Sequence, residues 1–388
     1  MIHRNATSEL LNLANQYKVV LITGPRQSGK TTLVRNTFKN KAYISLENPD
    51  TRTFAQEDPR GFLAQFPEGA ILDEVQRVPE LFSYLQQVVD EKDIAGHFIL
   101  TGSNNFLLQE NITQSLAGRI GQLTLLPFCL SELQQQQSLT INEYLYKGLY
   151  PPLYDKNFEI GKWYANYIQT YIEKDVRQLK NISNLSSFEK LLRLCAGRTG
   201  QLLNMSSLAI EAGVDSKTVS SWLSVLESSF IIFRLQPHHI NFNKRVVKMP
   251  KIYFYDTGIA TALLGIHNAS QLDNHAMRGN LFENFVVTEL LKQQYNEGQK
   301  GSLFFWRDNS GHEVDVLIET AGKLIPVEIK SGQTVTTDYF KGILNWNKIS
   351  GSTGGFIVYG GDQSQKRSNQ VTLLPWNQVV QIYPLKQH

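Results

Sequence analysis

Short apolar runs that alternate with stretches of helical period occupy the first third of the chain. Short, nearly continuous apolar runs predict strands buried on both faces, and the stretches between them predict helices. The expected strands are residues 19–23, 42–46, 70–74, 97–103 and 122–127, and the expected helices include 8–17 and 79–90. This alternation favours an α/β fold with a parallel sheet that helices cover on both faces.

The hydrophobic pattern changes further along the chain. From residue 141 to about residue 235 the apolar positions have mainly helical spacing, including a helix expected at 164–180. Later runs predict strands at 231–233, 252–254, 314–318, 324–329, 356–359 and 379–383. At about 100–200 residues per domain, the 388 residues suggest two or three domains, and with the change of pattern we expect three parts at 1–138, 139–250 and 251–388.

Composition narrows the class of protein. The chain is 41% hydrophobic and 19% charged, which is typical of a globular protein, and its net charge of +3 does not predict tight, charge-driven binding of nucleic acid. We expect no membrane partner, because no apolar run reaches about 18 residues and the N-terminus has no signal-peptide core. Cys129 and Cys195 stand far apart and outside any Cys-x-x-Cys pair, which favours buried thiols in a reducing, cytoplasmic compartment.

A glycine-rich motif joins the first expected strand to the helix that follows. It reads Gly24-Pro25-Arg26-Gln27-Ser28-Gly29-Lys30-Thr31-Thr32 and fits G-x-x-x-x-G-K-[ST], the P-loop. Backbone N–H groups of such a turn, together with the N-terminus of the next helix, attract phosphate. We therefore expect ATP at residues 24–32, with Lys30 on the β- and γ-phosphates and the Thr31 hydroxyl on Mg²⁺.

Polar residues at the ends of two other expected strands complete a hydrolytic set. Asp73 is expected to hold Mg²⁺, and Glu74 is the candidate base that polarises the attacking water. The strand that ends near residue 103 is expected beside the first strand, so that Ser103 or Asn104, which are equally placed, contacts the γ-phosphate or the water. A plain turn at this point is the alternative.

The middle of the chain contains the spacing of a helix-turn-helix. Ala209, Gly213 and Val219 stand at the required positions, and Asp215 is placed to cap the second helix. Lys217 is the one basic residue on the outward face of that helix, so we favour a winged-helix unit used for packing or as a lid over a reader of DNA. A basic cluster follows, interpreted either as a wing on a phosphate backbone or as a solvated loop: Lys244, Arg245, Lys248 and Lys251.

Charged residues recur inside the apolar strands expected in the last third. Asp315 lies in one strand, and Glu328 and Lys330 point to the same face of the next, while Glu283 lies on an apolar helix upstream. Clustered carboxylates bind Mg²⁺, and a lysine beside them orients water or stabilises a charged phosphoryl transition state. An ion pair at a sheet edge is the alternative. The histidines near 238 and 312 lack the spacing of a zinc site.

Several of these motifs together resemble the AAA-type ATPases of bacteria and archaea, in particular a group with an uncharacterised C-terminal domain. The similar segments are residues 24–32, 72–76, 100–103, 116–119, 253–258 and 283–286, so that the resemblance covers nearly the whole chain. Arg119 matches an arginine in that family's Leu-Ala-Gly-Arg segment. The resemblance implies either an arginine finger that acts on a neighbouring copy in a homo-oligomer or an internal salt-bridge partner.

The order of a helical Glu283, a strand Asp315 and Glu328-x-Lys330 resembles the PD-(D/E)xK nuclease superfamily. This implies a nuclease-like α/β domain with Mg²⁺ on Asp315 and Glu328, and with DNA or RNA as partner, although many members only bind. We therefore expect an Mg²⁺-dependent ATPase whose nucleotide cycle controls a nucleic-acid-binding or -cleaving domain. The alternative is an ATP-driven switch that binds a protein, with an inert nuclease-like domain.

Overall fold

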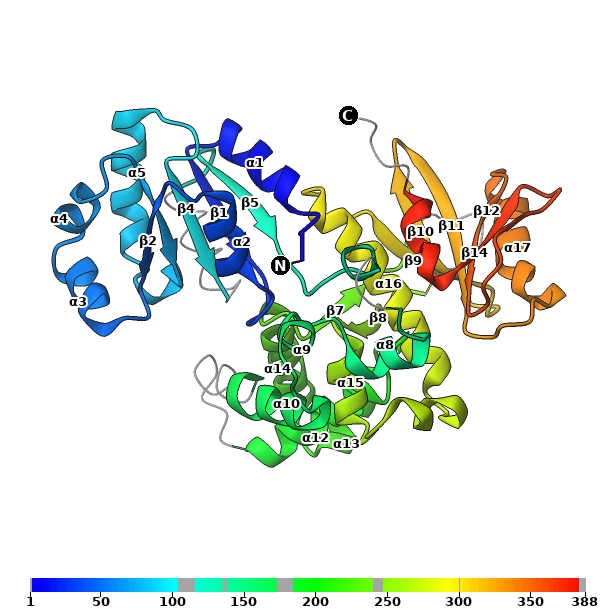
Figure 1. Cartoon of the computed structure of the whole chain (residues 1–388). Coiled ribbons are helices and arrows are strands. Elements are labelled where there is room, and N and C mark those ends of the chain that lie inside the picture. The colour runs from blue at the N-terminus through cyan, green and yellow to red at the C-terminus, as the bar shows by residue number, and fades with distance from the viewer. Residues whose placement is uncertain are drawn as a thin grey trace.

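Three parts follow one another in the structure, a computed structural model (Figure 1). A sheet with its helices is coloured blue to cyan, a helical part green to yellow, and a second sheet orange to red. The structure describes residues 2–103, 116–134, 138–172, 184–239, 247–299 and 301–383. Among the described helices, none is both long enough and apolar enough to cross a membrane.

The first part is built on a five-stranded parallel sheet. Its strands are β1 (Val19–Thr23), β2 (Ala42–Ser45), β3 (Ala70–Asp73), β4 (Phe98–Gly102) and β5 (Ile120–Thr124), in the order β2-β3-β4-β1-β5. The expected α/β sheet is confirmed, and so is the placement of β4 beside β1. Because the strands are parallel, the residues that follow β1, β3 and β4 meet at one edge of the sheet.

Both faces of this sheet are covered, which explains its nearly continuous apolar strands. Val20 and Ile22 of β1 pack towards α1 (Thr7–Gln16) and α2 (Lys30–Thr37). Val19 and Leu21 pack on the other face, in a second cluster. The elements on that face are α3 (Pro49–Glu57), α4 (Pro59–Ala64), the short 3₁₀ helix η1 (Val75–Arg77) and α5 (Leu81–Lys92).

The middle part combines helices with a small antiparallel sheet of order β6-β8-β7. Its elements are α7 (Leu130–Leu133), α8 (Ile141–Lys147), α9 (Pro152–Asp155), α10 (Ile160–Tyr167), a π-helical turn (Ile168–Ile172), α12 (Leu185–Ala196), β6 (Gln201–Leu202), α13 (Met205–Ala212), α14 (Ser216–Ser228), β7 (Ile232–Leu235), β8 (Lys251–Phe254), α15 (Thr257–Leu263) and η3 (Ala269–Asn274). The helix expected at 164–180 ends earlier, since α10 stops at Tyr167, and residues 173–183 lie outside the described part.

Two helices meet at Gly213 as the spacing predicts. Gly213 has a φ of 73° at the end of α13, and the Asp215 carboxylate accepts hydrogen bonds from the Lys217 and Thr218 N–H groups at the start of α14. The order α12, β6, α13, α14, β7 and β8 is the order of elements in a winged helix, and that interpretation stays a prediction. The expected boundary at residue 250 needs correction, because β8 pairs with β6 and β7 and therefore belongs to the middle sheet.

The last part begins with the long helix α16 (Arg278–Asn296) and contains a six-stranded mixed sheet of order β13-β14-β12-β11-β10-β9. Strands β9 (Leu303–Arg307), β10 (Glu313–Thr320) and β11 (Lys323–Lys330) are antiparallel, and the expected hairpin turns at Ala321 and Gly322. The chain continues through η4 (Thr337–Phe340), α17 (Lys341–Ser350), β12 (Gly355–Tyr359), β13 (Gln365–Lys366), β14 (Val371–Pro375) and η5 (Trp376–Ile382).

One strand prediction in this part is wrong. The strand expected at residues 379–383 does not form, because these residues fall in the 3₁₀ helix η5 and the residue after it, and the strand in this region is β14. Pro375 closes β14 because it offers no N–H for further pairing. Val379 and Ile382 are both buried, and a separation of three residues places them on one side of a 3₁₀ helix.

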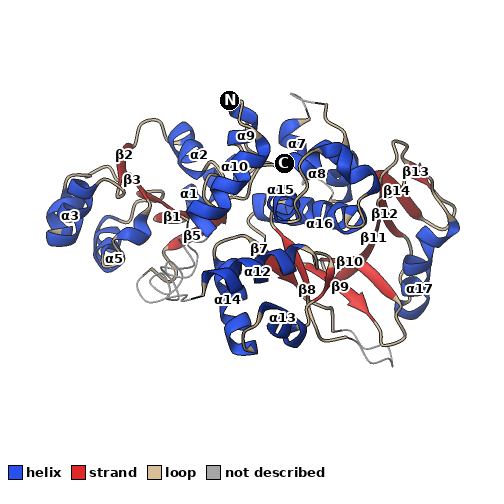
Figure 2. Ribbon diagram, turned by 90° about the horizontal axis from the view of Figure 1, so that it is seen from below, coloured by secondary structure: helices blue, strands red, loops and turns tan. Residues whose placement is uncertain are grey.

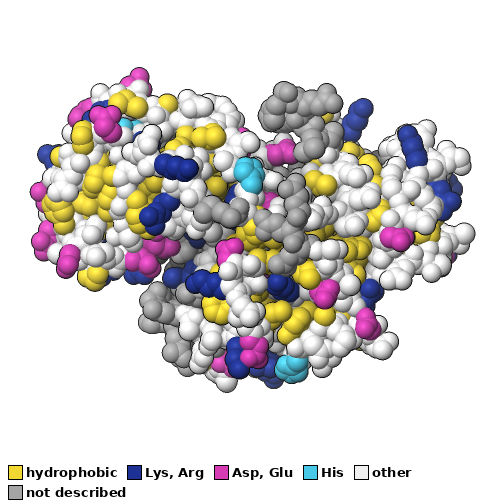
Figure 3. Space-filling model, in the orientation of Figure 1, with side chains coloured by type: hydrophobic (Ala, Val, Ile, Leu, Met, Phe, Trp, Pro, Cys, Tyr) yellow, Lys and Arg dark blue, Asp and Glu magenta, His cyan; other side chains and the backbone are white. Residues whose placement is uncertain are grey.

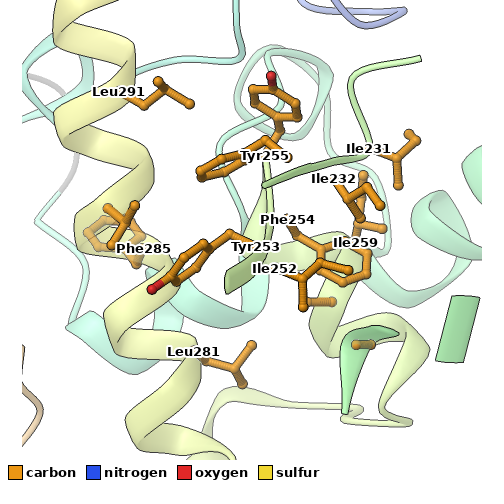
Figure 4. Packing of buried hydrophobic residues seen from close by; sticks show 14 of the residues in the cluster. Ile231, Ile232, Ile252, Tyr253, Phe254, Tyr255, Ile259, Leu281, Phe285 and Leu291 are labelled. Atoms are coloured by element: carbon orange, nitrogen blue, oxygen red, sulfur yellow. The ribbon is translucent and has the colours of Figure 1, made fainter. Parts of the chain in front are cut away.

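The middle and last parts share one hydrophobic core, which runs from Leu126 to Ile382. Figure 4 shows its centre, where Tyr253 of β8 lies towards α16 and Ile259 of α15 lies beside Phe254 on the other side of β8. The view from below shows β7 and β8 beside β9 and β10 (Figure 2), and His238 N–H donates a hydrogen bond to the Phe305 carbonyl at this junction. The first part has two clusters of its own, so the molecule consists of a first domain and a larger joined body.

Candidate functional site

The P-loop lies at the carboxyl edge of the first sheet, between β1 and α2. Gly24 and Gly29 have φ values of 147° and 91°, which residues with a Cβ rarely adopt. A Cβ at Gly24 would lie 2.1 Å from the Leu125 carbonyl oxygen, so the loop is packed tightly against the chain that leaves β5. The loop therefore has the backbone geometry that a phosphate cradle needs.

Lys30 is the buried cation of this loop. Its ammonium group donates hydrogen bonds to the Gly24 and Pro25 carbonyls at 3.0 and 2.8 Å. Burial lowers the pKa of Lys30 to about 8, while the Glu74 and Asp73 carboxylates oppose this shift. Both carboxylates are thus close enough to influence the lysine, as a hydrolytic site requires.

Asp73 ends β3 directly beside the P-loop helix. The Thr31 hydroxyl donates one hydrogen bond that the two Asp73 carboxylate oxygens share, each 3.1 Å from the hydroxyl oxygen. The Tyr43 hydroxyl at 2.6 Å and the Thr101 hydroxyl also donate to Asp73. A hydroxyl and a carboxylate side by side are oxygen donors of the kind that Mg²⁺ prefers, so Thr31 and Asp73 fit the expected metal.

Glu74 follows Asp73 in a left-handed backbone conformation, with a φ of 59°. This conformation turns its carboxylate towards β4, where the Ser103 hydroxyl donates a hydrogen bond of 3.2 Å to it. The Gln76 amide also donates to Glu74 and lies 3.3 Å from the Ser103 hydroxyl. The structure therefore brings Ser103 to Glu74, and Asn104 lies outside the described residues.

A cleft of about 810 Å³ opens in front of these groups, between the first domain and the middle helices. Figure 3 shows that basic side chains lie where these two bodies meet. P-loop residues and Glu74 line one wall, and residues of α9 and α10 with the segment that joins them line the other, among them Lys156, Lys162 and Trp163. The volume lies within the usual range of about 300–1,000 Å³ for ligand sites.

A smaller, largely apolar pocket of about 250 Å³ adjoins the cleft on the other side of the P-loop helix. The two cavities share Gly29, Thr32, Pro151 and Asp155. Its apolar lining includes Ile2, Leu33 and Phe128. The pocket and the cleft therefore adjoin each other at the start of α2.

Arg4 connects the P-loop to the chain that follows β5. The sequence did not suggest this contact. Its guanidinium donates to the Ser28 carbonyl at 2.8 Å, to the Leu126 carbonyl at 2.7 Å and to the Glu132 carboxylate at 3.1 Å. Both charged side chains are almost fully buried, at 8% and 0% exposure. A short helix signal in residues 8–17 was the only pattern near Arg4, so nothing in the sequence marked its role.

Arg119 lies far from its own P-loop. It precedes β5, and its carbonyl accepts a hydrogen bond from Val19 N–H, which places it at the opposite edge of the sheet. Its guanidinium pairs with both carboxylate oxygens of Asp90 on α5, at 2.5 and 2.9 Å. This geometry matches the salt-bridge alternative, and contact with a neighbouring copy stays a prediction.

The predicted nuclease-like residues converge in the last part. Asp315 accepts a hydrogen bond of 2.8 Å from Ile329 N–H, and the Lys330 ammonium lies 2.6 Å from Glu328 and 4.0 Å from Asp315. Burial raises the pKa of Glu328 to about 8, and the Asp315 carboxylate adds to this rise while Lys330 opposes it. Glu283 of α16 approaches the same cluster, where burial raises its pKa and Lys251 opposes the rise.

Lys251 was expected in an exposed basic cluster, and this expectation is wrong. The side chain is only 4% exposed, and its ammonium lies 2.9 Å from Glu283, 2.5 Å from Glu313 and 4.0 Å from Asp315. It is buried because β8 is the central strand of the middle sheet and its first residue faces the carboxylates of α16 and β10. Lys244 and Arg245 lie outside the described residues, and Lys248 is exposed.

The expected Mg²⁺ on Asp315 and Glu328 does not fit this cluster well. Each of the carboxylates of Glu283, Glu313, Asp315 and Glu328 already has a lysine or arginine within 4.0 Å. Within the described ranges, no group of three or more His, Cys, Asp or Glu side chains is arranged to hold a metal ion.

Comparison with known protein families supports the expected ATPase fold of the first domain. Residues 16–134 match a family model described as an AAA domain. Together with the parallel sheet and the P-loop at its edge, the match supports an AAA-type P-loop ATPase fold. Residues 138–270 and 278–379 match two models described as domains of unknown function, DUF8612 and DUF4143, so the nuclease-like interpretation of the last part stays a prediction.

Relatives cover nearly the whole chain. Uncharacterized proteins of Mycobacterium tuberculosis and Mycobacterium bovis are each 29% identical over 381 residues, which is 97% of this chain and 84% of the relative. A further uncharacterized protein, from Haemophilus influenzae, is 21% identical and covers 85% of this chain and 86% of its own. Among solved structures, a Walker-type ATPase of Pyrococcus abyssi is 16% identical, with 68% of this chain and 96% of that chain covered and a TM-score of 0.47.

Proposed function

We propose that the chain is an Mg²⁺-dependent ATPase whose nucleotide state controls its C-terminal, nuclease-like domain. The observation that carries the ATPase part is the set of groups around the P-loop: Lys30 in the loop, Thr31 bonded to Asp73, and Glu74 bonded to Ser103. Mg²⁺, when bound, would neutralise charge on the phosphates. Lys30 would contact the β- and γ-phosphates, and Glu74 would take a proton from the attacking water.

The apolar pocket beside α2 is our proposed site for the adenine ring. It shares Gly29 and Thr32 with the cleft, so a nucleotide with its phosphates on the loop extends into it. Leu33 and Phe128 offer apolar contact to the ring, and the polar side chains of His3 and Asn36 lie at the same pocket. Burial of an aromatic base in such a pocket orients the phosphates over Lys30.

ATP hydrolysis by purified protein tests the ATPase part. Phosphate release should require Mg²⁺ and should fall at least about 100-fold in Lys30→Ala protein, because the loop loses its phosphate-binding cation. Lys39→Ala, an exposed lysine just beyond α2, should hydrolyse ATP like the wild type. Equal rates in Lys30→Ala and the wild type would refute the proposal.

The alternative of an inert nuclease-like domain that binds a protein partner is favoured by the ion pairs around Lys251. A cleavage assay distinguishes the two functions: plasmid and single-stranded DNA are incubated with the protein and Mg²⁺ or Mn²⁺, with and without ATP. Cleavage that Asp315→Ala abolishes supports an active nuclease. Absence of such cleavage supports the inert domain. Figure 3 shows acidic and basic side chains interspersed over one face, which offers little support for charge-driven binding of nucleic acid there.

Two further roles stay proposals. Arg119 as an arginine finger requires a neighbouring copy, and its ion pair with Asp90 supports the structural role instead. Binding of DNA by the helices α13 and α14 has weak support, since Lys217 is the one basic residue in α14 and its neighbours are mainly serine and threonine.

A further inference from the structure

Lys251 reaches the acidic cluster of the last part from a different part of the molecule. It is the first residue of β8, where it pairs in register with Leu235 of β7 and Leu202 of β6. Its carboxylate partners come from α16, which carries Glu283, and from β10, which carries Glu313. Figure 4 shows the neighbouring Tyr253 of β8 directed towards α16, and its hydroxyl donates a hydrogen bond of 2.6 Å to Glu283.

Carboxylates surround the ammonium group of Lys251. A lysine so far removed from solvent is costly unless opposite charges surround it. Two carboxylates, Glu283 and Glu313, lie within 2.9 Å of the Lys251 ammonium, and Asp315 lies 4.0 Å away. The ammonium nitrogen also lies 5.6 Å from the centre of the Phe305 ring, and the face of an aromatic ring attracts a positive charge.

The carboxylate oxygens nearest Lys251 already have partners, whereas Glu328 Oε2, at the Lys330 end of the cluster, is buried without a hydrogen-bond partner among the described residues. Asp315 uses one oxygen for Ile329 N–H and has a lysine 4.0 Å from each oxygen. Glu313 is shared between Lys251 and Arg307, at 2.5 and 3.0 Å. A divalent cation needs several oxygens at about 2.0–2.6 Å, and two cations at the same oxygens repel each other.

We propose that the Lys251 ammonium is the resident cation of this cluster and occupies the place that a divalent metal takes in a PD-(D/E)xK nuclease. Each of the four carboxylates Glu283, Glu313, Asp315 and Glu328 lies within 4.0 Å of at least one of three protein cations, Lys251, Lys330 and Arg307. The cluster then joins the middle sheet to the last part and does not bind catalytic metal. This inference goes beyond the ATPase proposal. It uses the nuclease-like interpretation only to compare the position of the Lys251 ammonium with that of a nuclease metal ion.

Binding of Mn²⁺ to the nucleotide-free full chain, followed by electron paramagnetic resonance, tests the inference. Wild-type protein and Asp315→Asn should bind Mn²⁺ equally, because the cluster contributes no site. Lys251→Met should gain about one Mn²⁺ per chain, and the double variant Lys251→Met with Asp315→Asn should lose it again. Lys248→Met removes an exposed lysine three positions earlier and should behave like the wild type.

Two results would overturn the inference. One is a Mn²⁺ ion on wild-type protein that Asp315→Asn removes, and this comparison holds even if Lys251→Met does not fold. The other is a folded Lys251→Met protein that binds no more Mn²⁺ than its double variant. ATP hydrolysis measured on the same samples reports separately on the P-loop, so failure of the ATPase proposal would not be mistaken for failure of this one.

Discussion

Arg4 is the residue whose role depends most on distant contacts. Its partners Ser28 and Glu132 are 24 and 128 positions away, so no local pattern in the sequence could identify them. The P-loop residues could be identified, because they are consecutive, and Asp73 and Glu74 could be identified because they end a strand of a parallel sheet. Buried side chains that connect separate parts of a chain carry no such local signal, and Lys251 is the second example.

Replacement of Arg4 should destabilise the protein and weaken nucleotide binding. Arg4→Ala leaves the Glu132 carboxylate buried with its charge uncompensated, which typically costs about 3–5 kcal/mol. Arg4→Lys keeps the charge but not all the carbonyl contacts, and should cost less. Urea unfolding measures both effects, with Lys39→Ala as an exposed control expected within about 0.5 kcal/mol of the wild type. A wild-type midpoint for Arg4→Ala would contradict the contacts described here.

The pKa of Lys30 predicts a pH dependence for ATP binding. The free protein loses the Lys30 proton as the pH rises through about 8, whereas bound phosphates favour the charged lysine. Binding above pH 8 therefore takes up a proton, and the Kd for ATP should rise by up to about tenfold per pH unit there, with little change from this group below pH 7. Calorimetry at pH 9 in two buffers of different ionisation enthalpy measures the uptake. A Kd that stays flat from pH 7 to pH 9.5 would refute it.

At the scale of elements, burial on two faces made the first sheet predictable. The three inner strands β3, β4 and β1 are buried at every position, as parallel strands between helix layers are, whereas the edge strand β2 has two exposed residues. The strand in segment 371–383 was harder to locate from the sequence. Both β14 and the following 3₁₀ helix η5 carry apolar residues, and only β14 pairs with β12. Pairing is a long-range property, so the pattern alone could not decide which segment joins the sheet.

The turn from β1 into the P-loop sets a strict requirement at Gly24. Its φ is 147°, and a Cβ added there would lie 2.1 Å from the Leu125 carbonyl oxygen, which leaves no room for a side chain. Gly24→Ala should therefore displace the loop, weaken ATP binding at least about tenfold and lower the free energy of unfolding by about 1–3 kcal/mol. Gly265, with a φ of 73° and open space around it, is the matched control, and Gly265→Ala should leave ATP binding unchanged. Equal ATP affinity in both variants would contradict this packing.

At the scale of the whole molecule, the chain segment that leaves β5 is held from both sides. Arg4 of the first domain binds its carbonyl at Leu126, and α16 of the joined body binds it through Lys292 to the Phe128 carbonyl and through Glu289 to Leu130 N–H. Glu289 and Lys292 are also paired with each other at 2.9 Å. A buried polar path thus runs from the P-loop to the helix that carries Glu283.

The position of the cleft between two bodies predicts an optical signal. All five tryptophans lie at residue 163 or later, and among the residues that line the cleft Trp163 is the one tryptophan. Binding of a non-hydrolysable ATP analogue with Mg²⁺ should change tryptophan fluorescence, and Trp163→Phe should abolish the change. Trp222→Phe, which removes a buried indole beside Phe188, should retain it. A change that survives in Trp163→Phe would place the nucleotide elsewhere.

Single-turnover hydrolysis by Glu74→Gln protein tests the central claim most directly. The amide keeps the size of the side chain but cannot accept the proton of the attacking water. At saturating ATP and Mg²⁺, we expect the Kd to stay within about threefold of the wild type and the hydrolysis rate to fall at least about 100-fold. Hydrolysis at the wild-type rate would show that Glu74 is not the base and that the P-loop site does not work as described.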